Sequence, residues 1–242
     1  MLKCIAVMTS GGDSPGMNAA ARAVVRTALH EGVEVWGINN GYKGMLEDDM
    51  YQLSSRSVSD LIQRGGTFLG TARSKEFKTE AGRKKGLANL KKHGIEGLVI
   101  IGGDGSLTGG ALLSDLGMPI VGLPGTIDND VWGTDYTIGA DTAANTIVDA
   151  INKLRDTASA HRRIILIEVM GRKSGWLAMM SGIAGGAEYV LVPEVKFDIN
   201  EICEEIKQSY AGGKRYSIIV VAEGVGSAIE IGKVVAEKTE ID

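Results

Sequence analysis

Short apolar runs alternate with segments of helical period along most of the chain, and this alternation constrains the fold more than any other feature. In the first half, each apolar run is followed by a helical pattern or a glycine-rich turn. The runs stand at 4–8, 34–38, 98–101 and 119–123, with helical patterns at 17–30, 81–93 and 107–116. Strands that are buried on both faces read as continuous apolar runs, so the pattern predicts parallel sheets covered by helices on both sides.

The second half of the chain repeats the same rhythm. Strands are expected at 164–169, 189–192 and 217–221, and helices at 139–157, 175–184, 199–211 and 226–238. In the first of these helices, Ile147, Ile151 and Leu154 fall on one face. A chain of 242 residues is long enough for two such units. We therefore expect an α/β protein of two Rossmann-like, three-layer α/β/α domains with mainly parallel sheets, covering residues 1–138 and 139–242.

Charge, cysteine content and hydropathy exclude several classes of protein. The net charge of −4 gives no electrostatic basis for binding nucleic acid. Cys4 and Cys203 fit no metal-ligand spacing and are expected to be reduced, buried thiols. No apolar run approaches the ~18 residues of a membrane span, and no signal peptide is visible. We expect a soluble, cytoplasmic protein with no nucleic-acid or membrane partner.

Glycine-rich turns follow the predicted strands, at the edge where open α/β sheets bind ligands. The first strand leads into TSGGDSPG, and a helix begins at about Met17. Glycines at 11 and 12 let the backbone come close to a ligand, and the helix N-terminus offers N–H groups to a phosphate. No Lys-Ser/Thr pair follows, so this is not a P-loop. An ordinary tight turn between a strand and a helix is the alternative.

A second turn, GGDGS, follows the strand at 98–101. An aspartate among glycines at a strand end can hold Mg²⁺, usually together with retained water molecules. The glycines leave room for a nucleotide above the backbone. The alternative is that Asp104 is a helix N-cap, a position that favours the same residue type.

A third turn, GLPGTIDND, brings two aspartates to the end of a buried strand. With Thr126, the side chains of Asp128 and Asp130 could provide a general base, a partner for a metal or for the fold, and a hydrogen bond to a phosphate. An Asx-turn with a helix cap is the structural alternative, which accounts for one aspartate more easily than for both.

Arginines occur at positions from which they could bind the negatively charged phosphate groups of a ligand. Arg73 lies in a glycine-rich loop, Arg163 begins a strand and Arg172 follows the end of the same strand, while Glu223 ends the last strand. The sequence thus combines carboxylates suited to Mg²⁺, arginines suited to phosphate and glycine turns, without a Ser-His-Asp set or zinc ligands. This combination indicates phosphoryl transfer, in which catalysis is mainly positioning and charge neutralisation.

Five motifs together are specific, namely TSGGDSPGMNAA, GGTFLGTAR, GGDGS, PGTIDND and EVMGR. In order and spacing they closely resemble the bacterial-type ATP-dependent 6-phosphofructokinase family, over essentially all 242 residues. GGDG alone also resembles NAD kinases and diacylglycerol kinases, whereas PGTIDND with EVMGR separates this family from those. The resemblance implies the phosphofructokinase fold and a glycolytic kinase, a transferase with Mg²⁺ as cofactor. Its reaction is transfer of a phosphoryl group from ATP to the 1-hydroxyl of fructose 6-phosphate.

The resemblance also implies roles for individual residues, with Asp128 as the general base and Asp104 as the metal ligand. The implied catalytic set is Gly12, Thr126, Asp128, Asp130 and Arg172. The implied ATP contacts are Gly12, Tyr42, Arg73, Ser74, Gly103, Asp104, Gly105 and Ser106. The implied sugar-phosphate contacts are Thr126, Asp128, Arg163, Met170, Gly171, Arg172 and Glu223, with Arg163 reaching a sugar bound to a neighbouring subunit.

The family's choice of phosphoryl donor is reflected at two glycines. Within the family that the sequence resembles, ATP-dependent members carry glycine at the positions of Gly105 and Gly125. Pyrophosphate-dependent members tend to carry an aspartate and a lysine there. A side chain at 105 would intrude where the α-phosphate of a nucleotide lies. We therefore expect ATP as the donor.

The family also has an allosteric site for ADP and phosphoenolpyruvate at subunit contacts, and its members are homotetramers when complete. Matching effector positions are Arg22, Arg26, Arg155, Gly186, Glu188 and Lys214. A solvated basic helix face is the alternative for Arg22 and Arg26, which stand four residues apart. Two positions depart from the family pattern: Ser74 replaces a common aromatic residue next to the nucleotide, and Gly212 replaces a common basic residue near the effector.

Family members run on for roughly a further quarter of their length beyond the position of Asp242. The resemblance therefore implies that the second domain is incomplete at its C-terminal end, and that part of the fructose 6-phosphate clamp lies in the additional segment. We expect such a chain to bind ATP with Mg²⁺ but to handle the sugar phosphate poorly. Two other functions stay open, a pyrophosphate-dependent phosphofructokinase and a non-catalytic nucleotide-binding or regulatory fragment.

Overall fold

The computed structural model describes residues 2–241, which form two compact units. The first unit comprises the chain up to Thr126 together with Val131–Gly139, and the second comprises Ile127–Asp130 together with the chain from Ala140 onward. The short segment Ile127–Asp130 thus belongs to the second unit, whereas the predicted domain boundary at 138 puts it in the first domain.

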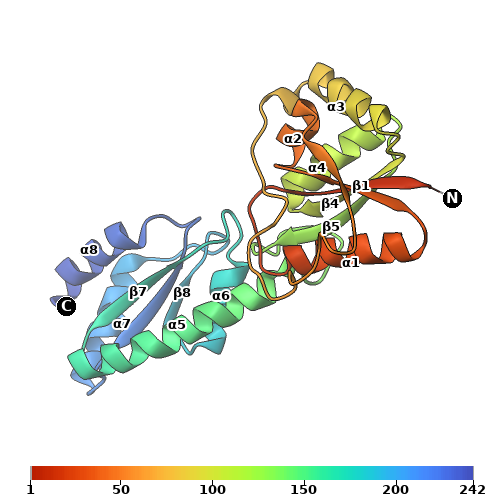
Figure 1. The fold of residues 1–242 in the computed structure, drawn as a ribbon. Coiled ribbons are helices and arrows are strands. Elements are labelled where there is room, and N and C mark those ends of the chain that lie inside the picture. Colours follow the sequence, from red (N-terminus) through yellow and green to blue (C-terminus); the bar gives the residue numbers. More distant parts are fainter. Residues whose placement is uncertain (1, 242) are drawn as a thin grey trace. The chain divides into compact units, whose positions relative to one another are not determined.

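The elements of the first unit are shown in Figure 1 and run in the order β1 (Cys4–Ser10), α1 (Met17–His30), β2 (Glu34–Ile38), α2 (Tyr42–Glu47), β3 (Met50–Leu53), the 3₁₀ turn η1 (Glu76–Lys78), α3 (Glu80–Lys92), β4 (Gly97–Gly102), α4 (Asp104–Ser114), β5 (Ile120–Thr126) and β6 (Ile138–Gly139). Those of the second unit are α5 (Ala140–His161), β7 (Ile164–Val169), α6 (Trp176–Ala184), β8 (Tyr189–Leu191), α7 (Ile199–Ala211), β9 (Ser217–Ala222) and α8 (Ala228–Thr239).

The sheet of the first unit has the strand order β3-β2-β1-β4-β5-β6. All its neighbouring strands pair in parallel except β2 and β3, which pair antiparallel. Because β2 and β4 flank β1 on opposite sides, the strand order reverses between β1 and β4. The crevice outside the carboxyl ends of strands at such a switch point is where open α/β sheets bind ligands.

Helices cover both faces of this sheet, as Figure 1 shows. On one face, Met17, Ala21 and Val25 of α1 pack against Val7 of β1 and Ile101 of β4. On the other face, α2, α3 and α4 bury their apolar side chains against the alternate residues of the same strands. The strands are therefore buried on both sides, which is why they appear in the sequence as unbroken apolar runs.

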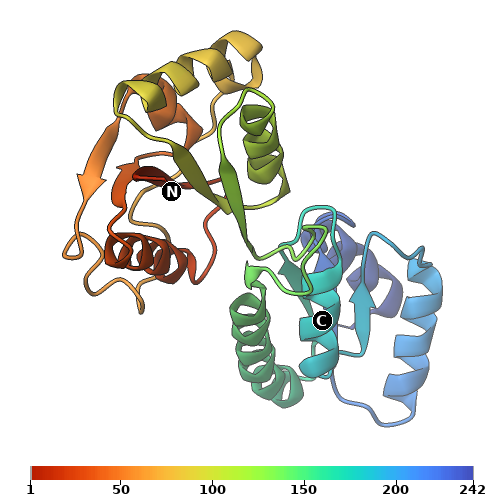
Figure 2. The same ribbon diagram turned by 90° about the vertical axis from the view of Figure 1, so that its right-hand side faces the viewer.

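The second unit has a parallel three-stranded sheet in the order β7-β9-β8. Helices α5 and α6 pack on one face through residues such as Ile151 and Leu177, and α7 and α8 pack on the other through Ile206 and Val235. Figure 2 shows these layers from a second direction. The predicted α/β class with mainly parallel sheets is confirmed in both units.

Most element boundaries lie within a few residues of those predicted, and three differences matter for the site. Helix α4 begins at Asp104 and not at 107, so its first turn contains the Asp-Gly-Ser part of the GGDGS motif. Strand β5 runs on to Thr126, so the PGT motif is its last part and not a loop. Helix α2 and strand β3 were not predicted at all, because they are short and lie among glycines and acidic residues.

Helix α2 is held against α3 by polar contacts at its end. Asp48, with a positive φ of 59°, caps α2, and its carboxylate accepts a hydrogen bond of 2.6 Å from Lys92 Nζ. His93 Nε2 lies 2.8 Å from the other carboxylate oxygen. The hydrogen bond from Lys92, followed by that to His93, lowers the pKa of Asp48. These contacts fix the helix that carries Tyr42.

Within residues 2–241, no helix combines the length and the apolar character needed to cross a membrane.

Candidate active site

The turn after β1 lies at the switch point of the first sheet. Ser10, the last residue of β1, pairs with Gly102, the last residue of β4. Gly11 has a φ of 91°, a conformation that favours glycine, and the hydroxyl of Thr71 donates a hydrogen bond to its carbonyl oxygen. No atom lies within 4 Å of the point where a side chain on Gly12 would begin. The backbone at Gly12 is therefore open to a ligand.

The turn after β4 presents the N-terminus of α4 beside the Gly11 turn. Gly103 is the N-cap of α4, and Asp104 is an exposed residue of the first helical turn. The alternative that Asp104 itself caps the helix is therefore wrong. A Cβ atom on Gly105 would meet no atom within 4 Å, whereas one on Gly11 would lie 3.2 Å from Ser106 Oγ. An exposed carboxylate, an open glycine and the positive end of a helix thus share one turn.

The Ser106 end of this turn is supported from behind by a buried tyrosine. Tyr42 is only 6% exposed, and its hydroxyl donates a hydrogen bond of 2.6 Å to the carbonyl oxygen of Ser106. Its ring stacks on Phe77 with the centroids 3.7 Å apart. Burial raises the pKa of Tyr42, so the hydroxyl stays a donor. A direct contact between Tyr42 and ATP stays a prediction, while its contact with the turn is present in the fold.

Removal of the Tyr42 hydroxyl tests whether the Ser106 turn depends on its hydrogen bond. We expect Tyr42→Phe to weaken ATP binding about five- to tenfold, because an unpaired buried carbonyl costs roughly 1–3 kcal/mol and loosens the Ser106 turn. Titration of ATP measures the effect. Tyr51→Phe is the matched control, because Tyr51 lies on β3 and is 37% exposed. Equal ATP affinity of the Tyr42→Phe and parent chains would show that the turn does not depend on Tyr42.

The loop that carries Arg73 is attached to the end of β1. Thr9 Oγ1 lies 2.7 Å from Thr67 Oγ1 and donates a hydrogen bond of 2.9 Å to the carbonyl oxygen of Gly70. Arg73 is exposed, and Ser74 Oγ accepts a hydrogen bond of 3.2 Å from the Phe77 N–H. The loop is thus fixed at both ends, with the arginine directed to solvent.

The end of β5 completes the polar edge of the first unit. A Cβ atom on Gly103 would lie 3.3 Å from Cβ of Thr126, so Thr126 faces the GGDGS turn. The hydroxyl of Thr137 donates a hydrogen bond of 2.6 Å to the carbonyl oxygen of Thr126. Gly125 is different from Gly105, because its Cβ would lie 3.0 Å from a methyl group of Ile101. Packing alone therefore favours glycine at 125, whichever phosphoryl donor is used.

In the second unit, the turn after β5 meets the turn after β7. Asp128 is buried, with 7% of its surface exposed, and its Oδ2 lies 3.7 Å from Nε of Arg172. Ile127 beside it packs into the core of this unit, which explains why Ile127–Asp130 belongs there. The Arg172 side chain is 66% exposed. An ion pair this open contributes on the order of 0–1 kcal/mol to stability, so folding alone does not require it.

Two residues of this site have strained backbones. Asn129 has a φ of 48° and Arg172 a φ of 53°. A side chain in this left-handed region costs on the order of 1–3 kcal/mol, and such residues cluster at functional sites. Glu223 stabilises the second of them, because its Oε1 accepts hydrogen bonds of 3.0 Å from the Gly171 N–H and 2.5 Å from the Arg172 N–H.

The remaining residues of the predicted catalytic and sugar-phosphate sets lie at different places in the second unit. Met170 is 62% exposed beside the Arg172 turn, and Asp130 is exposed near Asp128. Arg163 immediately precedes β7, whereas Arg172 follows it. A strand of this length spans roughly 20 Å. Arg163 therefore lies at the opposite edge of the sheet from Arg172 and Glu223.

The predicted effector residues are divided between the units. Arg22 and Arg26 lie on α1 of the first unit. In the second unit, Arg155 donates hydrogen bonds to the carbonyl oxygens of Gly185 and Gly186. Lys214 Nζ lies 3.0 Å from Glu188 Oε1, just before β9 and β8 respectively. These groups occupy the amino-terminal edge of the second sheet, away from Glu223 at its carboxyl edge.

The metal-ligand groups of the first unit suit a metal ion that is also bound by the phosphate groups of a ligand. Among residues 2–241, no group of three or more His, Cys, Asp and Glu side chains is placed to hold a metal. Asp104 is a single exposed carboxylate at a helix N-terminus. Mg²⁺ is commonly bound by one or two carboxylates together with substrate phosphates, which suits such a donor.

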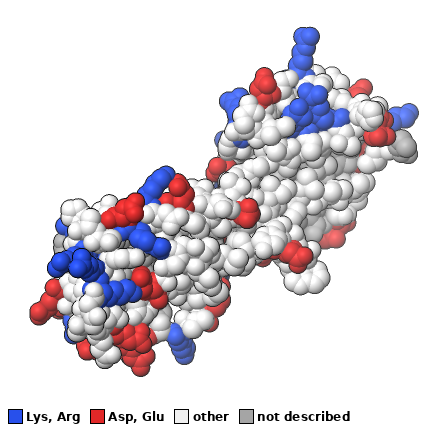
Figure 3. Space-filling model, turned by 90° about the horizontal axis from the view of Figure 1, so that it is seen from below, with Lys and Arg blue, Asp and Glu red and all other residues white. Residues whose placement is uncertain are grey.

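Charged side chains are interspersed on the face of the protein drawn in Figure 3, where lysines and arginines lie among aspartates and glutamates. On that face, an anionic ligand would meet individual cations and not a continuous basic surface.

A comparison with protein families identifies the fold. The model of the family described as Phosphofructokinase matches residues 4–242. The chain belongs to the phosphofructokinase family. The ATP-dependent 6-phosphofructokinase of Bacillus subtilis (strain 168) is 58% identical over 241 residues, which cover 100% of this chain and 76% of that relative. The protein of the same name from Halothermothrix orenii is 54% identical over 254 residues, with the same coverage.

Solved phosphofructokinases have the same fold. The structure of phosphofructokinase from Saccharomyces cerevisiae matches with a TM-score of 0.89 and 40% identity, covering 99% of this chain and 37% of that one. A pyrophosphate-dependent phosphofructokinase from Marinobacter aquaeolei matches with a TM-score of 0.87 at 24% identity, a likeness that concerns the fold alone. The predicted family and fold are therefore confirmed.

The residues that support the candidate site from behind could not be recognised from the sequence. Thr9, Thr71 and Phe77 contact the functional turns, but none of them stands out by residue type. The carboxylate of Glu194, which accepts a hydrogen bond of 2.8 Å from the Gly175 N–H, was missed as well. A glutamate after a short strand gives no signal of its own, because its partner lies in another loop.

Proposed function

We propose that this chain transfers the γ-phosphoryl group of ATP to the 1-hydroxyl of fructose 6-phosphate, giving ADP and fructose 1,6-bisphosphate. The observation that carries the proposal is the buried Asp128 carboxylate beside Arg172, in a chain whose relatives at 54–58% identity are named ATP-dependent 6-phosphofructokinases. A buried carboxylate next to a cation can accept the proton of a hydroxyl group while the cation faces developing negative charge.

The first unit binds the nucleotide in this proposal. The backbone N–H groups of the Gly11–Gly12 turn and of the first turn of α4 face the phosphates, and Arg73 adds a positive charge. Thr126, which faces Gly103, donates its hydroxyl to the transferred group. Asp104 is the residue that would hold Mg²⁺, which neutralises phosphate charge when bound.

The second unit binds and activates the acceptor. The Asp128 carboxylate removes the proton from the sugar's 1-hydroxyl, whose oxygen forms the new bond to the γ-phosphorus as the bond from that phosphorus to ADP breaks. Arg172 stabilises the negative charge that spreads over the transferred group, and Asp130 supports the turn. Met170, Gly171 and Glu223 line the sugar pocket, where Glu223 also fixes the backbone of the Arg172 turn.

We propose that Arg163 serves a second subunit, in a homotetramer. Its place at the amino-terminal edge of β7, about 20 Å of strand away from Arg172, does not suit a shared role with Arg172 on one sugar phosphate. A guanidinium there suits the 6-phosphate of a sugar bound to a neighbouring copy.

We place the enzyme in the cytoplasm, because Cys4 and Cys203 are both buried free thiols, as a reducing compartment maintains.

We also propose that ADP or phosphoenolpyruvate binds at a contact between subunits, through Arg22, Arg26, Arg155, Gly186, Glu188 and Lys214. Replacing Arg22 and Arg26 together with alanine should abolish the effect of either ligand on sugar-phosphate affinity, a coupling of about 1–3 kcal/mol, and spare basal turnover. Titrating each effector against the rate measures this. The matched control removes two exposed charges from α3, Lys84→Ala with Lys91→Ala. An undiminished effector response in the Arg22 and Arg26 variant would make those arginines surface charge only.

A coupled assay with two phosphoryl donors tests the proposed function. With fructose 6-phosphate as acceptor, we expect turnover with ATP and much slower turnover with pyrophosphate. Faster turnover with pyrophosphate would favour the pyrophosphate-dependent alternative. Binding of ATP with no product from either donor would favour a regulatory, non-catalytic chain.

A further inference from the structure

The turn Met170–Gly175, here called the arginine turn because it carries Arg172, is held at two places by carboxylates. At its beginning, Glu223 Oε1 accepts the N–H groups of Gly171 and Arg172. At its end, Glu194 Oε1 accepts the Gly175 N–H over 2.8 Å. Glu223 belongs to the sugar pocket proposed above, whereas Glu194 is outside the proposed catalytic and binding sets.

The Glu194 carboxylate lies directly against the backbone where the arginine turn enters α6. Gly175 is the N-cap of α6, and a Cβ atom there would lie 2.5 Å from Glu194 Oε2 and 2.5 Å from Cβ of Val192. Only a glycine lets the carboxylate come this close. An anion at the N-terminus of a helix is also favoured by the helix dipole, and a charge-assisted hydrogen bond to the backbone is stronger than a neutral one.

Hydrogen bonds inside the arginine turn connect its two ends. The Ser174 N–H donates a hydrogen bond of 2.9 Å to the carbonyl oxygen of Gly171, and the Trp176 N–H donates one of 3.3 Å to Ser174 Oγ. Because Arg172 lies between these contacts with a φ of 53°, its strained conformation persists only while both ends are fixed. A displacement at Gly175 therefore reaches Gly171 and Arg172 through a single short loop.

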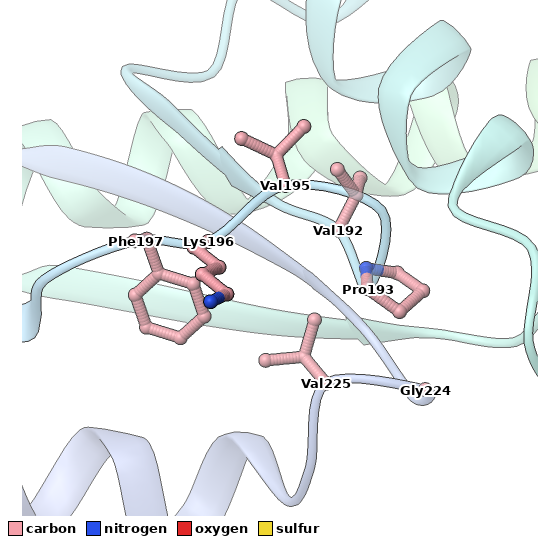
Figure 4. Close-up of a pocket in the computed structure, with 7 residues that line it drawn as sticks. All are labelled: Val192, Pro193, Val195, Lys196, Phe197, Gly224 and Val225. Atoms are coloured by element: carbon pink, nitrogen blue, oxygen red, sulfur yellow. The ribbon is translucent and has the colours of Figure 1, made fainter.

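The two carboxylates come from neighbouring loops that share a hollow. Figure 4 shows residues that line this hollow, among them Pro193 and Val195 from the loop after β8 and Gly224 and Val225 from the loop after β9. Its volume is about 390 Å³. Glu194 lies between Pro193 and Val195 in the chain, and Glu223 directly precedes Gly224. A Cβ atom on Gly224 would lie 3.2 Å from Cγ of Pro193. The loop after β8 and the loop after β9 are thus packed together, which sets the spacing between Glu194 and Glu223.

We propose that Glu194 is a positioning residue for phosphoryl transfer: by fixing Gly175 it holds the arginine turn, and with it Arg172 beside Asp128. This role rests on the proposed function, because it assumes that the turn binds the sugar phosphate. Glu194 itself touches neither substrate. Its contribution should appear in the handling of fructose 6-phosphate and leave ATP binding unchanged.

Two variants separate this role from a local one. Glu194→Ala removes the carboxylate, and Glu194→Gln keeps an oxygen that can accept the Gly175 N–H. With Glu194→Ala we expect the KM for fructose 6-phosphate to rise about tenfold with the KM for ATP unchanged, as expected when a charge-assisted hydrogen bond that orders a binding loop is lost. Glu194→Gln should restore most of the parent value.

Amide hydrogen exchange gives a readout that does not depend on catalysis. In Glu194→Ala we expect faster exchange at Gly175 and also at Gly171 and Arg172, with parent-like exchange in Glu194→Gln. Asp198→Ala is the matched control, because the Asp198 carboxylate accepts the Asn200 N–H over 2.8 Å and caps α7 further along the same loop. That control should speed exchange at the start of α7 and leave the arginine turn and both KM values unchanged.

The outcomes are distinct. Faster exchange at Gly175 alone, with parent-like exchange at Gly171 and Arg172, would make Glu194 a helix cap and overturn the proposal. Equal effects on the KM values for both substrates would do the same, because a general loss of stability affects them together. If the parent chain shows no turnover, the proposed function fails, but the exchange rates at Gly171 and Arg172 still decide whether Glu194 holds the turn.

Discussion

Asp128→Asn should lower kcat by about 10²–10⁴-fold and leave ATP binding nearly unchanged. The amide keeps the size and shape of the carboxylate but cannot accept the proton of the sugar's 1-hydroxyl, and a positioned general base contributes about that much to a rate. The first unit, which holds the proposed ATP turns, is not touched by the change. Initial rates with saturating ATP and fructose 6-phosphate give kcat, and calorimetric titration gives the affinity for ATP.

The control for this result is the same substitution at an exposed aspartate of the same unit. Asp149 lies on α5 and pairs with Lys153 on the helix surface. Asp149→Asn should keep the parent kcat. Comparable turnover by Asp128→Asn and the parent chain would remove Asp128 from the role of base, whatever its burial.

Gly105→Asp should weaken ATP binding by about 100-fold without unfolding the protein. No atom lies within 4 Å of the position that Cβ would take, so the new side chain fits the folded first unit. A carboxylate there would face the phosphates proposed to bind at the first turn of α4, and two like charges about 5 Å apart repel by roughly 3 kcal/mol at an effective dielectric constant of about 20. ATP titration and thermal unfolding measure the two effects.

Thr108→Asp adds the same charge to the same helix and serves as the control for Gly105→Asp. Thr108 is exposed and lies one turn further along α4. Its variant should bind ATP nearly as the parent does. If Gly105→Asp bound ATP as tightly as Thr108→Asp does, the phosphates would have to lie elsewhere.

The parts of the fold that were predictable are those in which the local pattern and the tertiary environment agree. Helix α1 and helix α7 begin and end at the expected residues, because a glycine or an aspartate stands at the N-cap and an apolar face runs along each helix. The parallel strands were recognisable since both of their faces are covered. The glycine turns were recognisable since the same residues recur after successive strands.

What could not be predicted depends on contacts between distant segments. Helix α2 is too short for its period to show. It is stabilised by Lys92, the last residue of α3, and by the C-cap residue His93, which lie 44 and 45 residues away from Asp48. The glycine at 125 suggested a choice of phosphoryl donor, yet a methyl group of Ile101 in the neighbouring strand already restricts that position. Glu194 likewise gains its meaning only from Gly175, 19 residues earlier.

The most direct test of the central claim is to follow all phosphorus-containing species by NMR while the chain acts on ATP and fructose 6-phosphate. We predict that the γ-phosphate signal of ATP decreases as a phosphate on C1 of the sugar and ADP appear in equal amounts, and that the Asp128→Asn chain forms this product far more slowly. Release of inorganic phosphate from ATP without a sugar bisphosphate, or product formed faster from pyrophosphate than from ATP, would contradict an ATP-dependent phosphoryl transfer to fructose 6-phosphate.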